Sequence, residues 1–238
     1  MRFAFFDLDD TLVDSRTALR AWAVDFAAAY VPNGLHAAAA EEVFELVDLA
    51  VNWPAFLADA RGRYGITASD EELMAQVAET YPGKFVLDDR VRSGLAELRA
   101  AGWLLGIVTN GSTLVQQAKV DSVGLRPYVD VVVDSEAAGH RKPDRRIFEV
   151  AAEKLGVELG PRGWMVGDRL DKDVAGGVAA GLRTVWITQG GQRAAGSAEP
   201  APASTHAVAS IFEAFQIVRE SESDPEPESE SESESATG

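Results

Sequence analysis

Short runs of apolar residues recur along the chain, separated by longer stretches in which apolar positions follow a helical period. Four runs occupy residues 2–7, 103–109, 129–134 and 163–168, and a weaker fifth occupies residues 183–188. Apolar runs of this length without alternation are typical of strands that are covered on both faces, as in a parallel sheet. We therefore expect these runs to form a buried parallel sheet.

The stretches between the later runs are predicted to be helices. Val91, Leu95 and Leu98 share one helical face, and residues 148–155 show the same spacing after Pro143, which suits a first helical turn. Strand and helix in repeated alternation indicate an α/β fold with a doubly wound parallel sheet. In such folds, ligands bind beyond the carboxyl ends of the strands.

The interval between the first two runs is far longer than one crossover helix needs. Within it, residues 15–86 have helical periodicity throughout, and Ser69 and Glu72 have the spacing of a capping box. We predict an inserted all-α cap above the ligand-binding edge of the sheet, where a lid would lie. The expected domains are a catalytic core (residues 1–14 and 87–219), the helical cap (residues 15–86) and a tail (residues 220–238).

The composition is that of an ordinary globular protein. Of 238 residues, 46% are hydrophobic and 25% are charged. No apolar run approaches the ~18 residues that suggest a membrane span, and no basic-then-apolar leader precedes the first run. We therefore expect a cytoplasmic protein without a membrane partner. The absence of cysteine excludes disulfides, zinc–thiolate sites and thiol nucleophiles.

Half of the net charge of -16 lies in the predicted tail. Residues 220–238 contain eight acidic residues and no Lys or Arg, and they lack large aliphatic side chains, so we expect this segment to be disordered. It is interpreted as a solvating appendage, with a docking or phosphorylation element as the alternative. The remaining residues carry 30 acids against 22 bases, which argues against a nucleic-acid partner.

Clusters of aspartates follow the first and fourth runs. Residues 7–10 contain three aspartates, and so do residues 168–173. Clustered carboxylates repel one another unless a cation or protons neutralise them. Each cluster alone is compatible with a solvated loop of capping acids or with a Mg²⁺ site, because carboxylate and carbonyl oxygens suit this ion. Two such clusters at one edge of a parallel sheet favour the metal site.

The ends of the other two runs add a hydroxyl and a positive charge. Thr109, Asn110 and Gly111 offer a hydroxyl and backbone N–H groups at a turn into a helix, as an anion site requires. Lys142 follows the third run after a short loop. The four strand ends together predict a site built from an acid, a hydroxyl, a cation and a second acid.

In this order, the segments DLDDT, VTNG, HRKPD and GDRLDKD, the last followed by VAGGVAAGLRTVW, resemble the four motifs of the haloacid dehalogenase-like hydrolases. The resemblance covers roughly residues 2–218 and is to the variant with a helical cap after the first motif. It implies a Rossmann-like core that binds Mg²⁺ and forms an aspartyl-phosphate. It also implies a phosphatase whose partner is a small phosphorylated metabolite.

The resemblance assigns the first motif to the covalent chemistry. Asp7 would be the nucleophile and a metal ligand. Asp9 would protonate the leaving alcohol, later activate water, and bind the metal through its backbone carbonyl. Thr11 would either position Asp9 through a hydrogen bond or cap the backbone.

The same resemblance assigns the second and third motifs to the phosphoryl group. Thr109 and the amide of Asn110 would hold the phosphoryl oxygens, in the anion site that includes Gly111. Lys142 would screen the nucleophile and the phosphate from each other.

The fourth motif would complete the metal site. Asp168 is implied as the second carboxylate on the metal, and Asp173 fits the outer acidic position. Asp171 does not fit this spacing, and we interpret it as a capping or solvated acid. Arg169 stands where the family often has Ser.

The identity of Asp9 separates the branches of the family, since its dehalogenases lack an Asp at this position. A phosphatase is therefore favoured over a dehalogenase. Three alternatives stay open: a mutase or phosphotransferase acting on sugar phosphates, a catalytically silent binding protein, and a receiver-like signalling domain. The length of the chain, its insertion and its late GDRLDKD segment count against the receiver.

Overall fold

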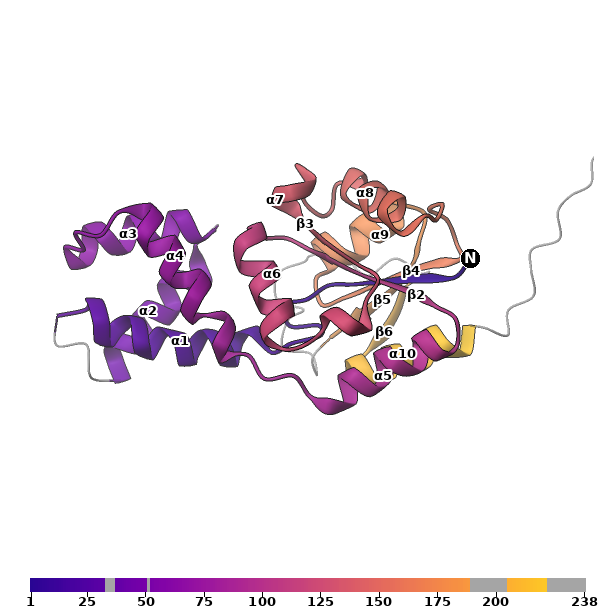
Figure 1. Cartoon of the computed structure of the whole chain (residues 1–238), viewed down its shortest axis with the longest axis horizontal. Helices are drawn as coiled ribbons and strands as arrows, with labels where there is room; N and C mark the ends of the chain where they lie inside the picture. Colours follow the sequence, from indigo (N-terminus) through magenta and orange to yellow (C-terminus); the bar gives the residue numbers. More distant parts are fainter. Residues whose placement is uncertain (33–36, 51, 189–204, 222–238) are drawn as a thin grey trace, which may run out of the picture.

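A six-stranded parallel sheet forms the centre of the molecule (Figure 1). The computed structural model describes residues 1–32, 37–50, 52–188 and 205–221. The strands are β1 (Phe3–Phe6), β2 (Leu104–Thr109), β3 (Val131–Asp134), β4 (Gly163–Gly167), β5 (Arg183–Ile187) and β6 (Thr205–Val208), in the spatial order β3-β2-β1-β4-β5-β6. All five predicted runs are strands, which confirms the doubly wound fold. The strand order reverses direction between β1 and β4, where such sheets open a crevice for ligands.

Helices cover both faces of the sheet. They are α5 (Asp89–Ala100), α6 (Thr113–Ser122), α7 (Ser135–Ala138), α8 (Arg145–Leu155), α9 (Ala175–Ala179) and α10 (Ile211–Glu220). The core also contains the 3-10 turn η2 (Arg126–Tyr128) and the π-helical turn η3 (Leu170–Val174). Figure 1 shows α5 and α10 side by side on one face and α8 and α9 on the other. The helix after Lys142 begins at Arg145 with Asp144 as its N-cap, so Pro143 precedes the helix and is not in its first turn.

The side chains of β1 alternate between the two faces of the sheet. Phe3 and Phe5 point into one apolar cluster with Phe148 of α8, while Phe6 packs against Phe215 of α10 at a ring-centroid distance of 5.6 Å. All four residues of β1 are completely buried. This burial on both faces explains why the strand reads as a continuous apolar run, and it makes β1 a rigid base for the residues that follow it.

The described residues between β1 and α5 form four α-helices. They are α1 (Ser15–Tyr30), α2 (Ala37–Leu49), α3 (Trp53–Tyr64) and α4 (Asp70–Thr80), followed by the 3-10 turn η1 (Pro82–Lys84). Figure 1 shows them to one side of the sheet, and we keep the name helical cap for residues 15–86. Trp22, Phe26 and Phe56 form its aromatic core, with ring centroids 4.9 to 5.9 Å apart. The predicted capping box of Ser69 and Glu72 is confirmed.

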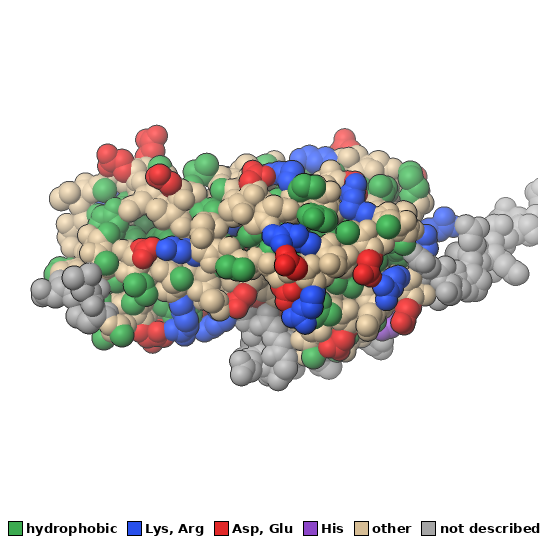
Figure 2. All heavy atoms as spheres, turned by 60° about the horizontal axis from the view of Figure 1, so that its bottom comes forward, with side chains coloured by type: hydrophobic (Ala, Val, Ile, Leu, Met, Phe, Trp, Pro, Cys, Tyr) green, Lys and Arg blue, Asp and Glu red, His purple; other side chains and the backbone are tan. Residues whose placement is uncertain are grey.

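Charges of both signs are intermixed on the molecular face shown in Figure 2. Arg219 pairs with Glu97 at 2.7 Å across α10 and α5. The last helix ends at Glu220, one residue inside the segment predicted to be disordered, and residues 222–238 of that segment lie outside the described part of the chain. No helix among the described residues is long and apolar enough to span a membrane.

Candidate active site

The residues predicted at four strand ends line one small cavity. Its volume is about 160 Å³, and it opens at the carboxyl edge of the sheet beside β1 and β4. The residues predicted for this site that line it are Asp7, Asp9, Thr109, Asn110, Lys142, Asp168 and Asp173. Segments more than a hundred positions apart in the sequence thus meet where the sheet topology requires.

The turn after β1 presents Asp7 and Asp9 at this edge. The N–H of Asp7 still donates to the carbonyl of Val166 in β4, at 2.9 Å, so the sheet fixes its backbone. The chain then turns sharply, because the N–H groups of Leu12 and Val13 both donate to the carbonyl of Leu8. Asp10 occupies the left-handed region with φ 58° in this turn, a conformation that Asp tolerates better than most residues.

Lys142 pairs with two buried carboxylates. Its Nζ lies 2.6 Å from Oδ1 of Asp7 and 2.7 Å from Oδ1 of Asp173, and it donates to the carbonyl of Val108 at 2.7 Å. Burial alone disfavours the ammonium, yet Asp173 and Asp7 together raise the pKa of Lys142 above its ordinary value. The lysine is therefore held as a cation between the two acids.

The environment of Asp7 leaves its negative charge incompletely compensated. Burial raises the pKa of Asp7 from 3.8 to about 8; Lys142 lowers it, whereas the nearby charges of Asp173 and Asp168 raise it further. The carboxylate oxygens of Asp7, Asp168 and Asp173 include a set that lies within 4.8 Å of one another. Three hard oxygen donors around one point, with excess negative charge, fit a hard divalent cation.

The turn after β4 brings Asp173 into this cluster. Asp173 lies in the π-helical turn η3, and its Oδ2 accepts from the N–H of Arg169 at 3.0 Å. A Cβ on Gly167 would lie 2.2 Å from this oxygen, so the carboxylate requires glycine at the strand end. Asp171 is exposed and pairs with Arg169, which agrees with its interpretation as a solvated acid.

The second motif is partly engaged in holding the site together. The side chain of Asn110 donates to the carbonyl of Lys142 at 3.0 Å and accepts from its N–H at 2.9 Å, so it fixes the backbone that carries the lysine. Any contact of Asn110 with substrate therefore rests on its backbone N–H. The N–H of Gly111 already donates to Oγ of Ser135 at 3.0 Å, contrary to its predicted place in an open anion site.

Two residues that the sequence reasoning missed hold Asp9. Lys119 Nζ lies 2.8 and 2.9 Å from the two carboxylate oxygens, and Gln116 Nε2 donates to Oδ2 at 3.1 Å and to Oγ1 of Thr109 at 2.5 Å. Both belong to the buried face of α6, next to Val115 and Val120. Polar residues within an apolar helical stripe were the signal that could have identified them.

The Asp9 carboxylate stands apart from the cluster of Asp7, Asp168 and Asp173. Among the described residues, the cluster that could hold a metal contains Asp7, Asp168 and Asp173, without a side-chain oxygen of Asp9. The hydroxyl of Thr11 makes neither the hydrogen bond to Asp9 nor the alternative backbone cap, since this buried hydroxyl has no hydrogen-bond partner among the described residues. Lys119 and Gln116, and not Thr11, make the side-chain hydrogen bonds that hold the Asp9 carboxylate.

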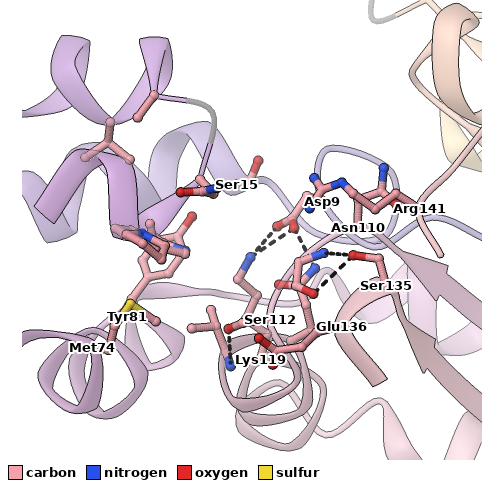
Figure 3. A pocket seen from close by; sticks show the side chains of 18 of the residues that line it. Asp9, Ser15, Met74, Tyr81, Asn110, Ser112, Lys119, Ser135, Glu136 and Arg141 are labelled. Atoms are coloured by element: carbon pink, nitrogen blue, oxygen red, sulfur yellow. Dashed lines mark hydrogen bonds and ion pairs between the residues drawn. The ribbon is translucent and has the colours of Figure 1, made fainter. Parts of the chain in front are cut away.

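A larger cleft of about 720 Å³ lies between the cap and the core. Figure 3 shows Met74 and Tyr81 on the cap side, Ser112 and Glu136 on the core side, and Asp9 between them. The cap contributes mostly apolar side chains, namely Leu19, Val47, Trp53, Pro54, Met74 and Tyr81. Asp9 and Asn110 line both cavities, so the cleft and the aspartate cluster adjoin each other.

Comparisons with known proteins agree with this arrangement. A stretch of 114 residues is 37% identical to the pyrimidine 5'-nucleotidase YjjG of Escherichia coli (strain K12), covering 48% of this chain and 47% of that protein. The glyceraldehyde 3-phosphate phosphatase of Pyrococcus abyssi is 30% identical over 207 residues, covering 80% of this chain and 82% of that protein. A HAD phosphatase from Thermococcus onnurineus superposes with a TM-score of 0.67 at 27% identity, covering 92% of this chain and 98% of that one.

The family model for haloacid dehalogenase-like hydrolases matches residues 1–181. This range contains the whole cap and the four strand ends that carry the motif residues. The parallel sheet, the aspartates beside its reversal point and this match lead to one assignment: the chain belongs to the haloacid dehalogenase-like hydrolases.

Proposed function

We propose that the protein is a Mg²⁺-dependent phosphatase that hydrolyses a phosphate monoester through an aspartyl-phosphate on Asp7. The observation that carries the proposal is the buried cluster of Asp7, Asp168 and Asp173, in which Lys142 pairs with Asp7 and Asp173, at a cavity on the edge of the sheet. The chain is similar to two proteins named as phosphatases over most of the length of each, and this similarity supports the reaction class.

The residues of the chain divide the proposed reaction between them. A carboxylate oxygen of Asp7 attacks phosphorus, the bond from phosphorus to the ester oxygen breaks, and Asp9 gives its proton to the leaving alkoxide. Asp9 then takes a proton from water, whose oxygen attacks the phosphorus. The bond from phosphorus to Asp7 breaks, which releases phosphate and restores the carboxylate.

The remaining motif residues hold charge and orientation. Lys142 offsets the charge of Asp7 and Asp173, and Thr109 presents its hydroxyl to the phosphoryl oxygens. Mg²⁺ held by Asp7, Asp168, Asp173 and the backbone carbonyl of Asp9 would supply the positive charge that brings an anionic ester next to an anionic nucleophile.

The metal site gives a prediction that does not depend on activity. Saturating Mg²⁺ should raise the melting temperature of the wild type by about 5–10 °C at a hundred times its Kd, because ligand binding at that excess adds about 2.7 kcal/mol. Asp168→Asn should lose most of this shift in differential scanning fluorimetry. Asp171→Asn is the matched control and should keep it, since Asp171 is exposed and lies outside the cluster. Equal shifts in both variants would contradict the site.

The cleft supports a leaving group larger than a triose. Its volume of about 720 Å³ and its apolar cap wall suit a flat, partly apolar body, for which the half-buried Trp53 offers an aromatic face. We therefore propose nucleoside monophosphates as preferred substrates over three-carbon phosphates. The similarity to a pyrimidine nucleotidase supports the same class.

The test is the release of inorganic phosphate from matched substrates in the presence of Mg²⁺. We expect kcat/KM for a nucleoside 5'-monophosphate to exceed that for glyceraldehyde 3-phosphate at least about tenfold, which corresponds to about 1.4 kcal/mol. Trp53→Leu should reduce this ratio. The melting temperature of the variant shows whether the cap is still folded. A preference for the triose phosphate would overturn the substrate class, and isomerisation of a sugar phosphate with little phosphate release would indicate a mutase.

A further inference from the structure

Lys119 lies outside the four motifs, yet it makes the closest contacts to the side chain of Asp9. Its ammonium reaches both carboxylate oxygens, at 2.8 and 2.9 Å, and only 5% of the lysine side chain is exposed. Burying an ammonium is costly unless it is paired. This lysine is therefore committed to Asp9 and is not a solvated helix residue.

The surroundings of Lys119 fix its position from the cap side. Nζ lies 5.0 Å from the ring centroid of Tyr81 and 5.1 Å from that of Phe85, within the range of cation–π attraction. Tyr81 is the C-cap that follows α4, and Phe85 follows η1, so both belong to the segment through which the chain returns from the cap to the core. The two rings also contact each other, with centroids 4.9 Å apart.

A second residue of α6 restrains Asp9 from the core side. Gln116 is 2% exposed and joins Oδ2 of Asp9 to the hydroxyl of Thr109. The Asp9 carboxylate thus has a two-pronged contact to Lys119 and a third contact to Gln116, while 29% of its side chain stays exposed toward the cleft. Figure 3 shows this fork from Lys119 to Asp9 at the centre of the pocket.

We propose that Lys119 is a positioning residue that orients the Asp9 carboxylate for proton transfer to the leaving alcohol, and that Tyr81 and Phe85 tie this orientation to the cap. The proposal rests on the proposed phosphatase function. A flexible carboxylate would reach the leaving oxygen only part of the time, whereas one held by a buried fork is preorganised for it. Removing the fork should therefore harm the proton transfer more than the attack by Asp7.

Leaving groups of different basicity separate these two steps. An alkyl phosphate needs a proton on its departing oxygen, whereas p-nitrophenyl phosphate releases a stable anion without one. Positioned acid catalysis contributes about 10²- to 10⁴-fold to the rate. For Lys119→Met, kcat/KM on an alkyl phosphate should fall about 100-fold, and the ratio of alkyl to p-nitrophenyl kcat/KM should fall at least about tenfold. Lys119→Arg, which retains a donor fork, should recover part of the ratio.

Two controls distinguish positioning from a structural role. Lys154→Met removes an exposed lysine from α8 and should leave the ratio unchanged. In an Asp9→Asn background, Lys119→Met should change the ratio by less than about twofold, because residues that act as a unit are not additive. If Lys119→Met fails to fold, Gln116→Met tests the same prediction and should lower the ratio to a smaller degree.

The outcomes separate this inference from the function on which it rests. A folded wild type that hydrolyses neither ester in Mg²⁺ would overturn the phosphatase proposal and this inference with it. A wild type that hydrolyses both, with equal losses on both esters in Lys119→Met, would overturn the positioning role alone. A ratio effect that persists undiminished in the Asp9→Asn background would also overturn it.

Discussion

Asp7→Asn is expected to lower kcat by about 10³-fold or more on every phosphate monoester that the wild type hydrolyses. An amide is no nucleophile toward phosphorus, and the other carboxylate that pairs with Lys142, that of Asp173, already accepts from the N–H of Arg169. Phosphate release in Mg²⁺ at saturating substrate measures the loss. Retention of more than about one hundredth of the wild-type rate would reject Asp7 as the nucleophile.

The same variant should be more stable than the wild type at high pH when the metal is removed with EDTA. The folded wild type has an Asp7 pKa of about 8, against an ordinary value of 3.8. Between these values the folded state holds a proton that the unfolded state has released, so the stability of the wild type falls as pH rises toward 8. Asp7→Asn lacks this loss, and its advantage in melting temperature should widen from pH 5 to pH 8. A constant difference over that range would contradict the burial of an incompletely compensated charge.

Lys142→Met is expected to destabilise the metal-free protein by about 3–5 kcal/mol, the usual cost of removing one partner from a buried ion pair. The lysine side chain is 2% exposed, and its loss leaves the buried side chains of Asp7 and Asp173 without the cation that they share. Urea denaturation at pH 7.5 in EDTA measures the change. The double variant with Asp7→Asn should recover part of the loss, because the amide replaces an acid that would otherwise have to stay protonated next to Asp173.

Lys84→Met provides a matched control for this second prediction. Lys84 also pairs with an aspartate, Asp25, but 28% of the lysine side chain and 58% of the aspartate side chain are exposed. Pairs of this kind contribute roughly 0–1 kcal/mol. If the Lys84 and Lys142 variants lost similar stability, the buried network around Lys142 would not have the energetic role that its geometry indicates.

The sequence predicted the sheet well because the central strands are buried on both faces. Such strands leave an apolar run that needs no knowledge of their neighbours, as in β1, where every residue is inaccessible. The sixth strand, β6, was missed for the opposite reason. It lies at the edge of the sheet, its four residues include Thr205 and His206, and only Val208 is buried, so its pattern does not differ from that of a loop.

The candidate site was predictable where the backbone alone places a residue. Asp7 and Asp168 follow neighbouring strands, and parallel topology brings them together whatever the side chains do. The fork from Lys119 to Asp9 depends on how α6 is rotated against the turn after β1, which no local pattern records. The π-helical turn that carries Asp173 likewise depends on the room above Gly167, which only the folded structure shows.

The path of the chain through Tyr81 and Phe85 restricts how this enzyme could be rebuilt from modules. The cap is one continuous insertion between β1 and α5, so a chimera would replace it with a foreign cap through two junctions outside the sheet. Yet the two rings beside Lys119 belong to the return segment, and a chimera joined before Tyr81 would keep them, while one joined after Phe85 would discard them. The choice of junction would thus determine whether a chimera keeps the aromatic contacts of Lys119, and with them the proposed orientation of Asp9.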